Sequence, residues 1–205
     1  VADMRVVALA PAHAGVQRIA RHPGLVQDGD HGGGLVTEDT PLTPNTERGR
    51  KRLEAETQWL ELWRAYGLPV MIFRLAGIYG PGRNQLQSLL EGTAKRVIKP
   101  GQVFNRIHVG DIGGAVAMAL GHVGPLGVFN LTDDEPCPPQ DVVAHAAGML
   151  GMNPPPEIPF EEADLSPMGR SFYGENKRVA NGHIKRALGY AFRFPTYREG
   201  LAACL

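Results

Sequence analysis

The feature that most constrains the fold is residues 68–82, a short apolar run that ends in a Gly-Pro-Gly turn. Val70–Leu75 contains Val, Ile and Phe and is interrupted only by Arg74, which is typical of a strand buried on both faces of a parallel sheet. A charged segment with helical periodicity, Glu47–Tyr66, comes before it, and Gly67 is a suitable helix stop. Helix, glycine, buried strand and turn together predict half of a βαβ unit, and therefore an α/β protein.

The turn after this strand is the first candidate for a binding site. In open α/β sheets, ligands bind just beyond the carboxyl ends of the strands. Residues 76–82, Ala-Gly-Ile-Tyr-Gly-Pro-Gly, occupy that place, so we expect them to form one wall of a site. A plain corner between a strand and a loop is the alternative, because the same pattern fits both.

Length and composition bound the function classes. The 205 residues, 43% of them apolar, are enough for one domain with a core, or for a large domain with a small lobe. Lys+Arg and Asp+Glu balance at 21 each, which argues against nucleic acid as the main partner. The apolar runs are too short to span a bilayer and no secretory signal is present, so we expect a cytoplasmic protein. Cys137 and Cys204 lack the spacing of a metal site, and we expect no metal.

The pattern also predicts elements further along the chain. We expect a short helix over 84–90, a strand over 103–109, and a helix over 112–121 with Asp111 as its N-cap. A buried strand at 128–131 and a helix from Pro138 or Pro139 to about residue 150 follow. Residues 1–34 show little periodicity, and we interpret the three glycines at 32–34 as a flexible turn, because no helix follows them.

Four segments, taken in order, resemble the extended short-chain dehydrogenase/reductase superfamily, and in particular its NAD-dependent epimerase/dehydratase-like members. The segments are Gly67-Leu-Pro-Val-Met-Ile-Phe-Arg-Leu-Ala-Gly-Ile-Tyr-Gly-Pro-Gly82, Arg106-Ile-His-Val-Gly-Asp-Ile112, Gly127-Val-Phe-Asn-Leu-Thr-Asp-Asp-Glu-Pro136 and Tyr197-Arg-Glu-Gly-Leu201. The resemblance implies a Rossmann-like fold and NAD or NADP as the cofactor. The oligomeric state is left open, with a homodimer as one alternative.

The resemblance predicts an incomplete doubly wound parallel sheet with a small C-terminal substrate lobe. Residues 1–34 are then a poorly matched N-terminal segment, 35–150 the Rossmann-like portion and 151–205 the substrate lobe. A dinucleotide fold needs a Gly-x-Gly-x-x-Gly turn, because the pyrophosphate approaches backbone N–H groups there, and the sequence has none. We therefore expect that this chain is part of a longer enzyme and lacks its phosphate-binding half. We also expect that the chain alone binds NAD(P)H poorly. The misfit before Asp30 suggests an aberrant N-terminal sequence, such as a shifted reading frame would produce.

The family's catalytic pair does not match. Its active members use Tyr-x-x-x-Lys on the long helix, in which the Lys lowers the Tyr pKa so that the phenol acts as acid or base. In this chain, Arg48 and Arg52 fall on those two positions, and arginine cannot replace a general acid or base. One interpretation is a cationic clamp for a carboxylate or phosphate; the other is a solvated helix face balanced by Glu54 and Glu56.

The resemblance also assigns candidate binding residues. The cofactor candidates, which lie beside the nicotinamide in the family, are Ala76, Gly77, Ile78 and Tyr79. The substrate candidates are Arg83, Asn84, Arg106, His108 and Lys177. Arg106 and His108 share one face of the expected strand. A satisfied core histidine is the alternative for His108, and a surface loop is the alternative for the segment that contains Lys177.

Two functions follow, and fold resemblance alone cannot separate them. The first is an NAD(P)-dependent oxidoreductase or nucleotide-sugar epimerase, with a small-molecule substrate such as a sugar nucleotide and with neither nucleic acid nor a membrane as partner. The second is a non-catalytic dinucleotide-binding sensor or scaffold, because the Tyr/Lys pair is missing. An inert fragment of either is a third interpretation.

Overall fold

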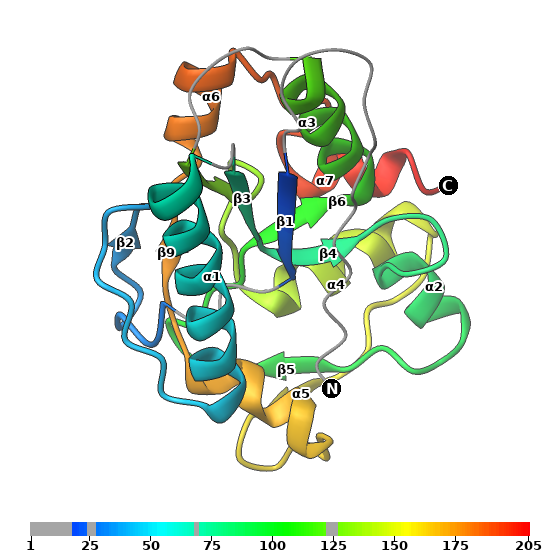
Figure 1. The fold of residues 1–205 in the computed structure, drawn as a ribbon. Helices are drawn as coiled ribbons and strands as arrows, with labels where there is room; N and C mark the ends of the chain where they lie inside the picture. Colours follow the sequence, from blue (N-terminus) through cyan, green and yellow to red (C-terminus); the bar gives the residue numbers. More distant parts are fainter. Residues whose placement is uncertain (1–17, 24–27, 68–69, 122–126) are drawn as a thin grey trace.

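The computed structural model describes residues 18–23, 28–67, 70–121 and 127–205. At its centre is a parallel three-stranded sheet in the order β1-β3-β7, formed by Arg18–Pro23, Val70–Leu75 and Gly127–Leu131 (Figure 1). All six residues of the middle strand, β3, are buried. Because β3 has neighbours on both edges and helices on both faces, its side chains must be apolar or paired. The predicted burial of Val70, Ile72 and Phe73 is confirmed, since none exceeds 1% exposure.

Helix α1, Glu47–Tyr66, covers one face of β3. The hydroxyl of Thr46 caps its first turn by accepting a hydrogen bond from Gly49 N at 3.0 Å. Gly67 ends the helix in the left-handed conformation, with φ 63°. Trp59 is buried in a cluster with Val70 and Ile72, which point to this face.

Helices α3, Val109–Gly121, and α6, Gly182–Leu188, belong to the core on the other face of β3. Met71, Phe73 and Leu75 point there, because successive side chains of a strand alternate between faces. They are packed with Ile112, Ala115, Ala119, Ile184 and Leu188 of the two helices. A parallel sheet with helices on both faces is the expected Rossmann-like α/β architecture.

A buried ion pair joins α1 to the middle of β3. Arg74 donates from Nε to Glu56 Oε2 at 3.1 Å and from Nη2 to Glu56 Oε1 at 2.6 Å. Both side chains are at most 4% exposed. Asp28 Oδ1 lies 3.9 Å from Arg74 Nη1, and the same nitrogen donates to the carbonyl of Glu38 at 3.4 Å. The one charged residue in the apolar run therefore fastens both the helix and residues 28–38 to the sheet.

The strand expected at 103–109 is shorter than predicted. Strand β6 is Arg106–His108, and α3 begins directly at Val109. The prediction that Asp111 is an N-cap is therefore wrong, since this residue lies in the first turn. Its buried carboxylate accepts hydrogen bonds from Arg193 N, Phe194 N and Tyr190 Oη at 2.8–3.0 Å. A negative charge is favourable at this end of a helix, and here it also holds a distant loop.

Strand β1 was not predicted. It pairs in parallel with β3 over its whole length, Arg18 opposite Val70 and Pro23 opposite Leu75. Its sequence, Arg-Ile-Ala-Arg-His-Pro, has neither alternation nor an apolar run. The tertiary pairing with a buried neighbour therefore overrides the weak local pattern. The possible element at Val6–Ala10 lies outside the described residues.

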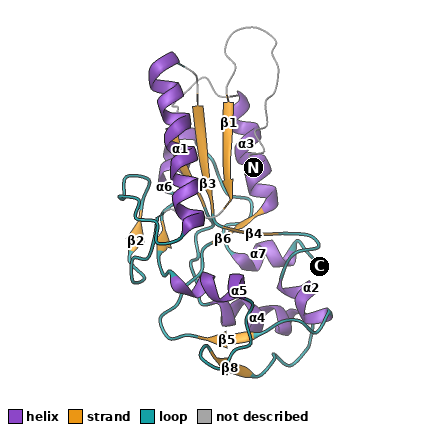
Figure 2. Cartoon of the chain, turned by 60° about the horizontal axis from the view of Figure 1, so that its bottom comes forward, coloured by secondary structure: helices purple, strands orange, loops and turns teal. Residues whose placement is uncertain are grey.

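A second part of the molecule lies beyond the carboxyl ends of the central strands (Figure 2). It contains the parallel pair β5, Arg96–Ile98, and β8, Glu157–Pro159, with helices α2, Gln85–Leu90, α4, Pro139–Met149, α5, Pro167–Ser171, and α7, Tyr197–Ala202. Buried side chains of α2, α4 and α7 form one cluster. We call this part the lobe.

Two short parallel pairs complete the fold. Strand β4, Gly77–Tyr79, pairs with β6, and β2, Leu35–Val36, pairs with β9, Arg178–Val179. Elements from both sides of residue 150 occur in the sheet part and in the lobe. The division of the chain into domains at residues 34 and 150 stays a prediction. No helix in the described part of the chain is long and apolar enough to cross a membrane.

The Arg74–Glu56 pair provides a test of this fold. Replacing Glu56 with Ala leaves the Arg74 guanidinium buried without its bidentate partner. We expect the free energy of unfolding to fall by about 3 kcal/mol, because removing one partner of a buried pair strands the other charge. Urea denaturation followed by circular dichroism measures this change.

The matched control is Glu61→Ala on the exposed side of the same helix. We expect that variant to differ from the wild type by no more than about 0.5 kcal/mol. Equal effects of the two substitutions would contradict the proposed importance of the buried pair.

Candidate functional site

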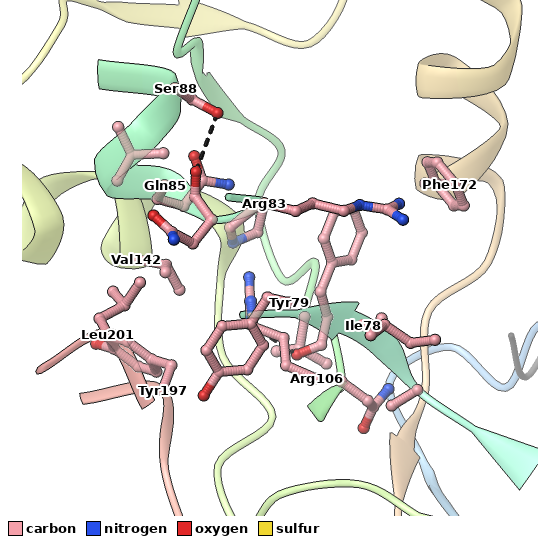
Figure 3. Close-up of a pocket in the computed structure, with 18 of the residues that line it drawn as sticks. Ile78, Tyr79, Arg83, Gln85, Ser88, Arg106, Val142, Phe172, Tyr197 and Leu201 are labelled. Carbon is pink, nitrogen blue, oxygen red and sulfur yellow. Dashed lines mark hydrogen bonds between the residues drawn. The ribbon is translucent and has the colours of Figure 1, made fainter. Parts of the chain in front are cut away.

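A cavity of about 540 Å³ lies where the chain leaves the carboxyl end of β3 and enters the lobe (Figure 3). The segment that follows β3 lines the cavity, with Val142 of α4 and Tyr197 and Leu201 of α7 on one side and Phe172 on the other (Figure 3). The start of α2 and residues 103–106 complete it. The position agrees with the rule that ligands bind beyond the carboxyl edge of a parallel sheet.

The cavity gathers most of the predicted binding residues. Its lining includes Ala76, Gly77, Ile78, Tyr79, Arg83, Asn84, Arg106 and Lys177. His108, Arg48 and Arg52 do not line it. Residues separated by about 100 positions in the sequence thus share one cavity, although their roles in binding stay predictions.

Hydrogen bonds around Asn105 explain why these segments meet. Gly77 N donates to the carbonyl of Asn105 at 3.0 Å, which sets β4 beside β6. The side chain of Asn105 points the other way: Nδ2 donates to the carbonyl of Lys177 at 2.9 Å, and Oδ1 accepts from Val179 N at 2.9 Å. One residue therefore connects the segment after β3 to the one that carries Lys177.

His108 occupies the core position that was its alternative interpretation. It is 5% exposed, and its ring centroid lies 4.0 Å from that of Phe194 and 5.3 Å from that of Tyr79. Its Nδ1 accepts a hydrogen bond from Gly110 N at 3.1 Å. Burial lowers the pKa of His108, and this favours a neutral ring between aromatic neighbours.

The two inner cations of the cavity are held in different ways. Arg106 donates from Nη1 to the carbonyl of Phe104 at 3.0 Å and to Sγ of Cys137 at 3.1 Å. Lys177 is buried, and its Nζ donates to the carbonyl of Gly29 at 2.8 Å and to Glu175 Oε2 at 2.6 Å. Lys177 thus has an anionic partner, whereas the contacts of Arg106 in the described part of the chain are with neutral groups.

Three tyrosines line the cavity, and none of them is activated. Burial raises the pKa of Tyr79, Tyr173 and Tyr197 above the ordinary value of a phenol. The three hydroxyls therefore keep their protons near neutral pH. They can donate hydrogen bonds to a ligand, but they are poorly suited to remove a proton from one.

The arginines at the family's catalytic positions lie on α1, outside the cavity. Arg48 is exposed, and Arg52 is partly buried one turn further along the helix. Burial, together with the smaller effect of the positive charge of Arg48, lowers the pKa of Arg52 to about 10. At neutral pH Arg52 is still charged, so this helix face offers cations and no acid–base pair.

Two buried carboxyl groups beside the site were missed. Asp28 is 3% exposed, and burial raises its pKa to about 6 although Lys177 and Arg74 oppose the shift. Asp133 is 1% exposed, and burial raises its pKa to about 7. Each has an Oδ2 atom without a hydrogen-bond partner among the described residues. Asp133 closely follows strand β7, so the carboxyl-edge rule could have found it, whereas Asp28 carries no signal in the sequence.

The aromatic part of the lining was also missed. It comprises Phe104, Phe172, Tyr173 and Tyr197, in addition to the predicted Tyr79. Tyr197 belongs to a segment that resembles the family, but its place in the cavity was not predicted, and the other three come from segments without a recognisable motif. No group of three or more His, Cys, Asp or Glu side chains in residues 18–23, 28–67, 70–121 and 127–205 could hold a metal ion.

Comparison with known proteins gives a consistent result. The model of the NAD dependent epimerase/dehydratase family matches residues 26–132, which is more than half of the 205 residues. A 3-diazoavenalumate denitrifying reductase from a Streptomyces species is 28% identical over 205 residues. The match covers 92% of this chain and 65% of that reductase, so the chain spans less than two thirds of its relative.

Solved structures agree with the fold. A functionally unknown conserved protein from Silicibacter pomeroyi is 50% identical, with a TM-score of 0.83 over 91% of this chain and 65% of that one. The dTDP-glucose 4,6-dehydratase DesIV from Streptomyces venezuelae, solved with NAD and TYD bound, is 21% identical. Its TM-score is 0.72, over 91% of this chain and 57% of that one, and at this identity the likeness concerns the fold.

The raised pKa of Asp28 predicts a dependence of stability on pH. The folded state binds this proton more tightly than the unfolded chain does, because the pKa rises from 3.8 to about 6. The resulting stabilisation is present below about pH 4 and is lost as the pH rises through about 6. An Asp28→Asn variant has no carboxyl group to titrate at this position. The difference in unfolding free energy between the variant and the wild type should therefore shift in favour of the variant by up to about 3 kcal/mol as the pH rises from 4 to 7.

Urea denaturation at a series of pH values measures this difference. Asp39→Asn, at an exposed position, is the matched control and should follow the wild type at every pH. A constant offset between Asp28→Asn and the wild type across the range would show that Asp28 titrates alike in the folded and unfolded states.

Proposed function

Because this chain belongs to the NAD dependent epimerase/dehydratase family, we propose that its cavity is the nicotinamide-facing and substrate-facing part of an NAD(P)-dependent oxidoreductase site. The observation that carries the proposal is the convergence of Ala76–Tyr79 with Arg83, Arg106 and Lys177 on one cavity at the carboxyl edge of the sheet. The reductase name of the Streptomyces relative supports redox chemistry. In this proposal the nicotinamide, when bound, supplies or accepts a hydride.

The end of β3 fits a flat ring. Ala76 and Gly77 present almost no side chain to the cavity, and Gly77 is exposed there. A Cβ atom built on Gly77 would lie 3.1 Å from the carbonyl oxygen of Asn105, so the backbone of β6 approaches this position closely and favours glycine here. We propose that Ala76, Gly77, Ile78 and Tyr79 border the nicotinamide. The described residues do not supply the glycine-rich turn that a pyrophosphate needs.

The lobe side of the cavity carries positive charge toward the substrate. We propose that Arg83, Arg106 and Lys177 bind an anionic small molecule, with Asn84 at the edge of the same wall. DesIV was solved with a nucleotide and NAD, which makes a sugar nucleotide one candidate substrate. His108 then acts behind Tyr79, as a packing residue, and not as a ligand.

A non-catalytic nucleotide-binding sensor is the second candidate function. Arg48 and Arg52 replace the acid–base pair, and burial keeps the cavity tyrosines protonated. Under the enzyme proposal, the cavity tyrosines can orient a substrate, whereas Arg48 and Arg52 lie outside the cavity, so a proton must move by way of another group or not at all. Under the sensor proposal, the bound cofactor is never turned over.

Ligand-observed NMR with NADH tests the cofactor part of the proposal. The protons of the nicotinamide ring should broaden more than those of the adenine, because the residues present here border the nicotinamide. Gly77→Val should reduce this broadening at least about fivefold, because it adds a branched side chain at the cavity wall where the Asn105 carbonyl already approaches closely. Gly113→Val, on the exposed side of α3, should leave the broadening unchanged. Equal broadening of adenine and nicotinamide protons in both variants would refute the placement.

The arginines on α1 provide a test of the acid–base argument. Arg48→Tyr alone should not create activity near neutral pH, because an unassisted phenol keeps a pKa of about 10. The double variant Arg48→Tyr/Arg52→Lys restores the family's pair in the sequence, but both positions lie outside the cavity, so its rate should stay within about twofold of that of Arg48→Tyr. For the same reason, Arg52→Lys alone should change neither binding nor turnover by more than about twofold.

The readout is the pH dependence of nicotinamide absorbance in the presence of candidate substrates. If the wild type shows an ionisation near neutrality that survives both substitutions, another acid or base operates, and Asp133, whose pKa burial raises to about 7, is the next residue to replace. If every variant binds cofactor without turnover, the sensor proposal is favoured.

A further inference from the structure

We infer that the substrate of this cavity is an aromatic carboxylate, bound through Arg106 and Arg83, and not a sugar nucleotide. This inference rests on the proposed function and names the substrate class of the same site. It follows from which groups of the lining are already bonded within the fold and which are left for a ligand.

Most neutral polar groups of the lining are engaged in holding the walls. Asn84 uses Oδ1 to accept from Gln87 N at 3.0 Å and Nδ2 to donate to the carbonyl of Gly80 at 2.9 Å. Asn105 is used at both ends, as described above. The hydroxyl of Ser88 donates to the carbonyl of Asn84 at 3.2 Å. A sugar presents many hydroxyl groups, and this lining has few unoccupied partners for them.

Two of the four cations are also neutralised. Lys177 pairs with Glu175 at 2.6 Å, and Lys95 pairs with Asp164 at 3.4 Å. Arg83 and Arg106 have no acidic partner within 4.0 Å among the described residues. The positive charge available to a ligand therefore comes from these two guanidinium groups, of which Arg106 also interacts electrostatically with the buried Asp133 carboxyl.

Arg106 presents a preformed carboxylate fork. All side-chain hydrogen bonds of Arg106 within the described part of the chain go through Nη1, to the carbonyls of Phe104 and Cys137 and to the Cys137 sulfur. These bonds fix the plane of the guanidinium and leave the Nε–Nη2 edge for a ligand. Arg74 binds the Glu56 carboxylate with this same edge, so the chain already contains one example of the pairing.

The rest of the lining suits a flat apolar ring. Five aromatic side chains face the cavity, namely Tyr79, Phe104, Phe172, Tyr173 and Tyr197. The rings of Phe104 and Tyr173 pack edge to face at 5.1 Å, which makes a rigid corner, and Phe172 is 50% exposed. Arg83 extends toward the side of the cavity on which Phe172 lies (Figure 3). Aromatic walls favour offset or edge contacts with a ligand ring.

The volume agrees with a small acid. Pockets of about 300–1,000 Å³ enclose one ligand of drug size. A cavity of about 540 Å³ therefore has room for a small aromatic acid. The aromatic lining, the two guanidinium groups and the small number of unbonded neutral polar groups thus all favour an aromatic carboxylate.

Isothermal titration calorimetry with trans-cinnamate, cinnamamide and UDP-glucose tests this inference on the 205-residue chain. Cinnamate and its amide have nearly the same shape and differ in charge. We expect cinnamate to bind at least about tenfold more tightly than cinnamamide, because a bidentate ionic pair adds to the ring contacts. UDP-glucose should bind more weakly than cinnamate.

Variants assign the preference to the two arginines. Arg106→Lys should weaken cinnamate binding about tenfold and leave cinnamamide unchanged, because lysine keeps the charge and loses the fork. Arg83→Ala, at an exposed position, should weaken cinnamate binding about threefold with little risk to folding. Arg64→Lys and Arg64→Ala, on the exposed last turn of α1, are the matched controls and should bind as the wild type does.

Three outcomes would overturn the inference: equal binding of acid and amide, tighter binding of UDP-glucose than of cinnamate, and no binding of cinnamate. None of these measurements uses a nicotinamide. Failure of the substrate inference is therefore distinguishable from failure of the proposed function, which depends on the NADH experiment above.

Discussion

The fold depends on how one buried arginine is neutralised. Arg74 lies in the middle of a strand that is otherwise apolar, with helices packed on both of its faces. Glu56 supplies a bidentate carboxylate from α1, and Asp28 supplies a second, more distant charge. A buried ion pair adds less to stability than its contacts suggest, because both charges lose their hydration. A fold that leaves one of the two charges buried without its partner is, however, strongly unfavourable. It therefore specifies the position of α1 and of residues 28–38 on the sheet.

The elements with strong local signals could be predicted from the sequence. The bounds of α1 and β3 follow from a cap, a terminal glycine and an uninterrupted apolar run, and the structure has the same bounds. Strand β1 and the early start of α3 could not be predicted, because both are set by distant partners: β3 in one instance, and the segment around Phe194 in the other. Local pattern fails where tertiary contacts decide.

The candidate site shows the same division. The resemblance identified residues that follow the strands, and eight of these share one cavity. It did not assign Phe104, Phe172, Tyr173, Tyr197 or Asp28 to the site, because these residues matter through burial and neighbours that only the folded chain supplies, whereas Asp133 could have been found from its place after β7. Comparison with the family's catalytic pattern also showed where this chain departs from it, since Arg48 and Arg52 stand in place of the Tyr/Lys acid–base pair.

The path of the chain has a mechanical consequence. The polypeptide passes between the sheet part and the lobe several times, and Asn105 ties two of these passages together near the cavity. Neither part can separate from the other without breaking that junction. In hydrogen exchange, the amides of β6 and β9 should therefore open together, as a single cooperative unit and not as two hinged bodies. Entry of a ligand then depends on side chains at the rim, such as the half-exposed Phe172, and not on domain opening.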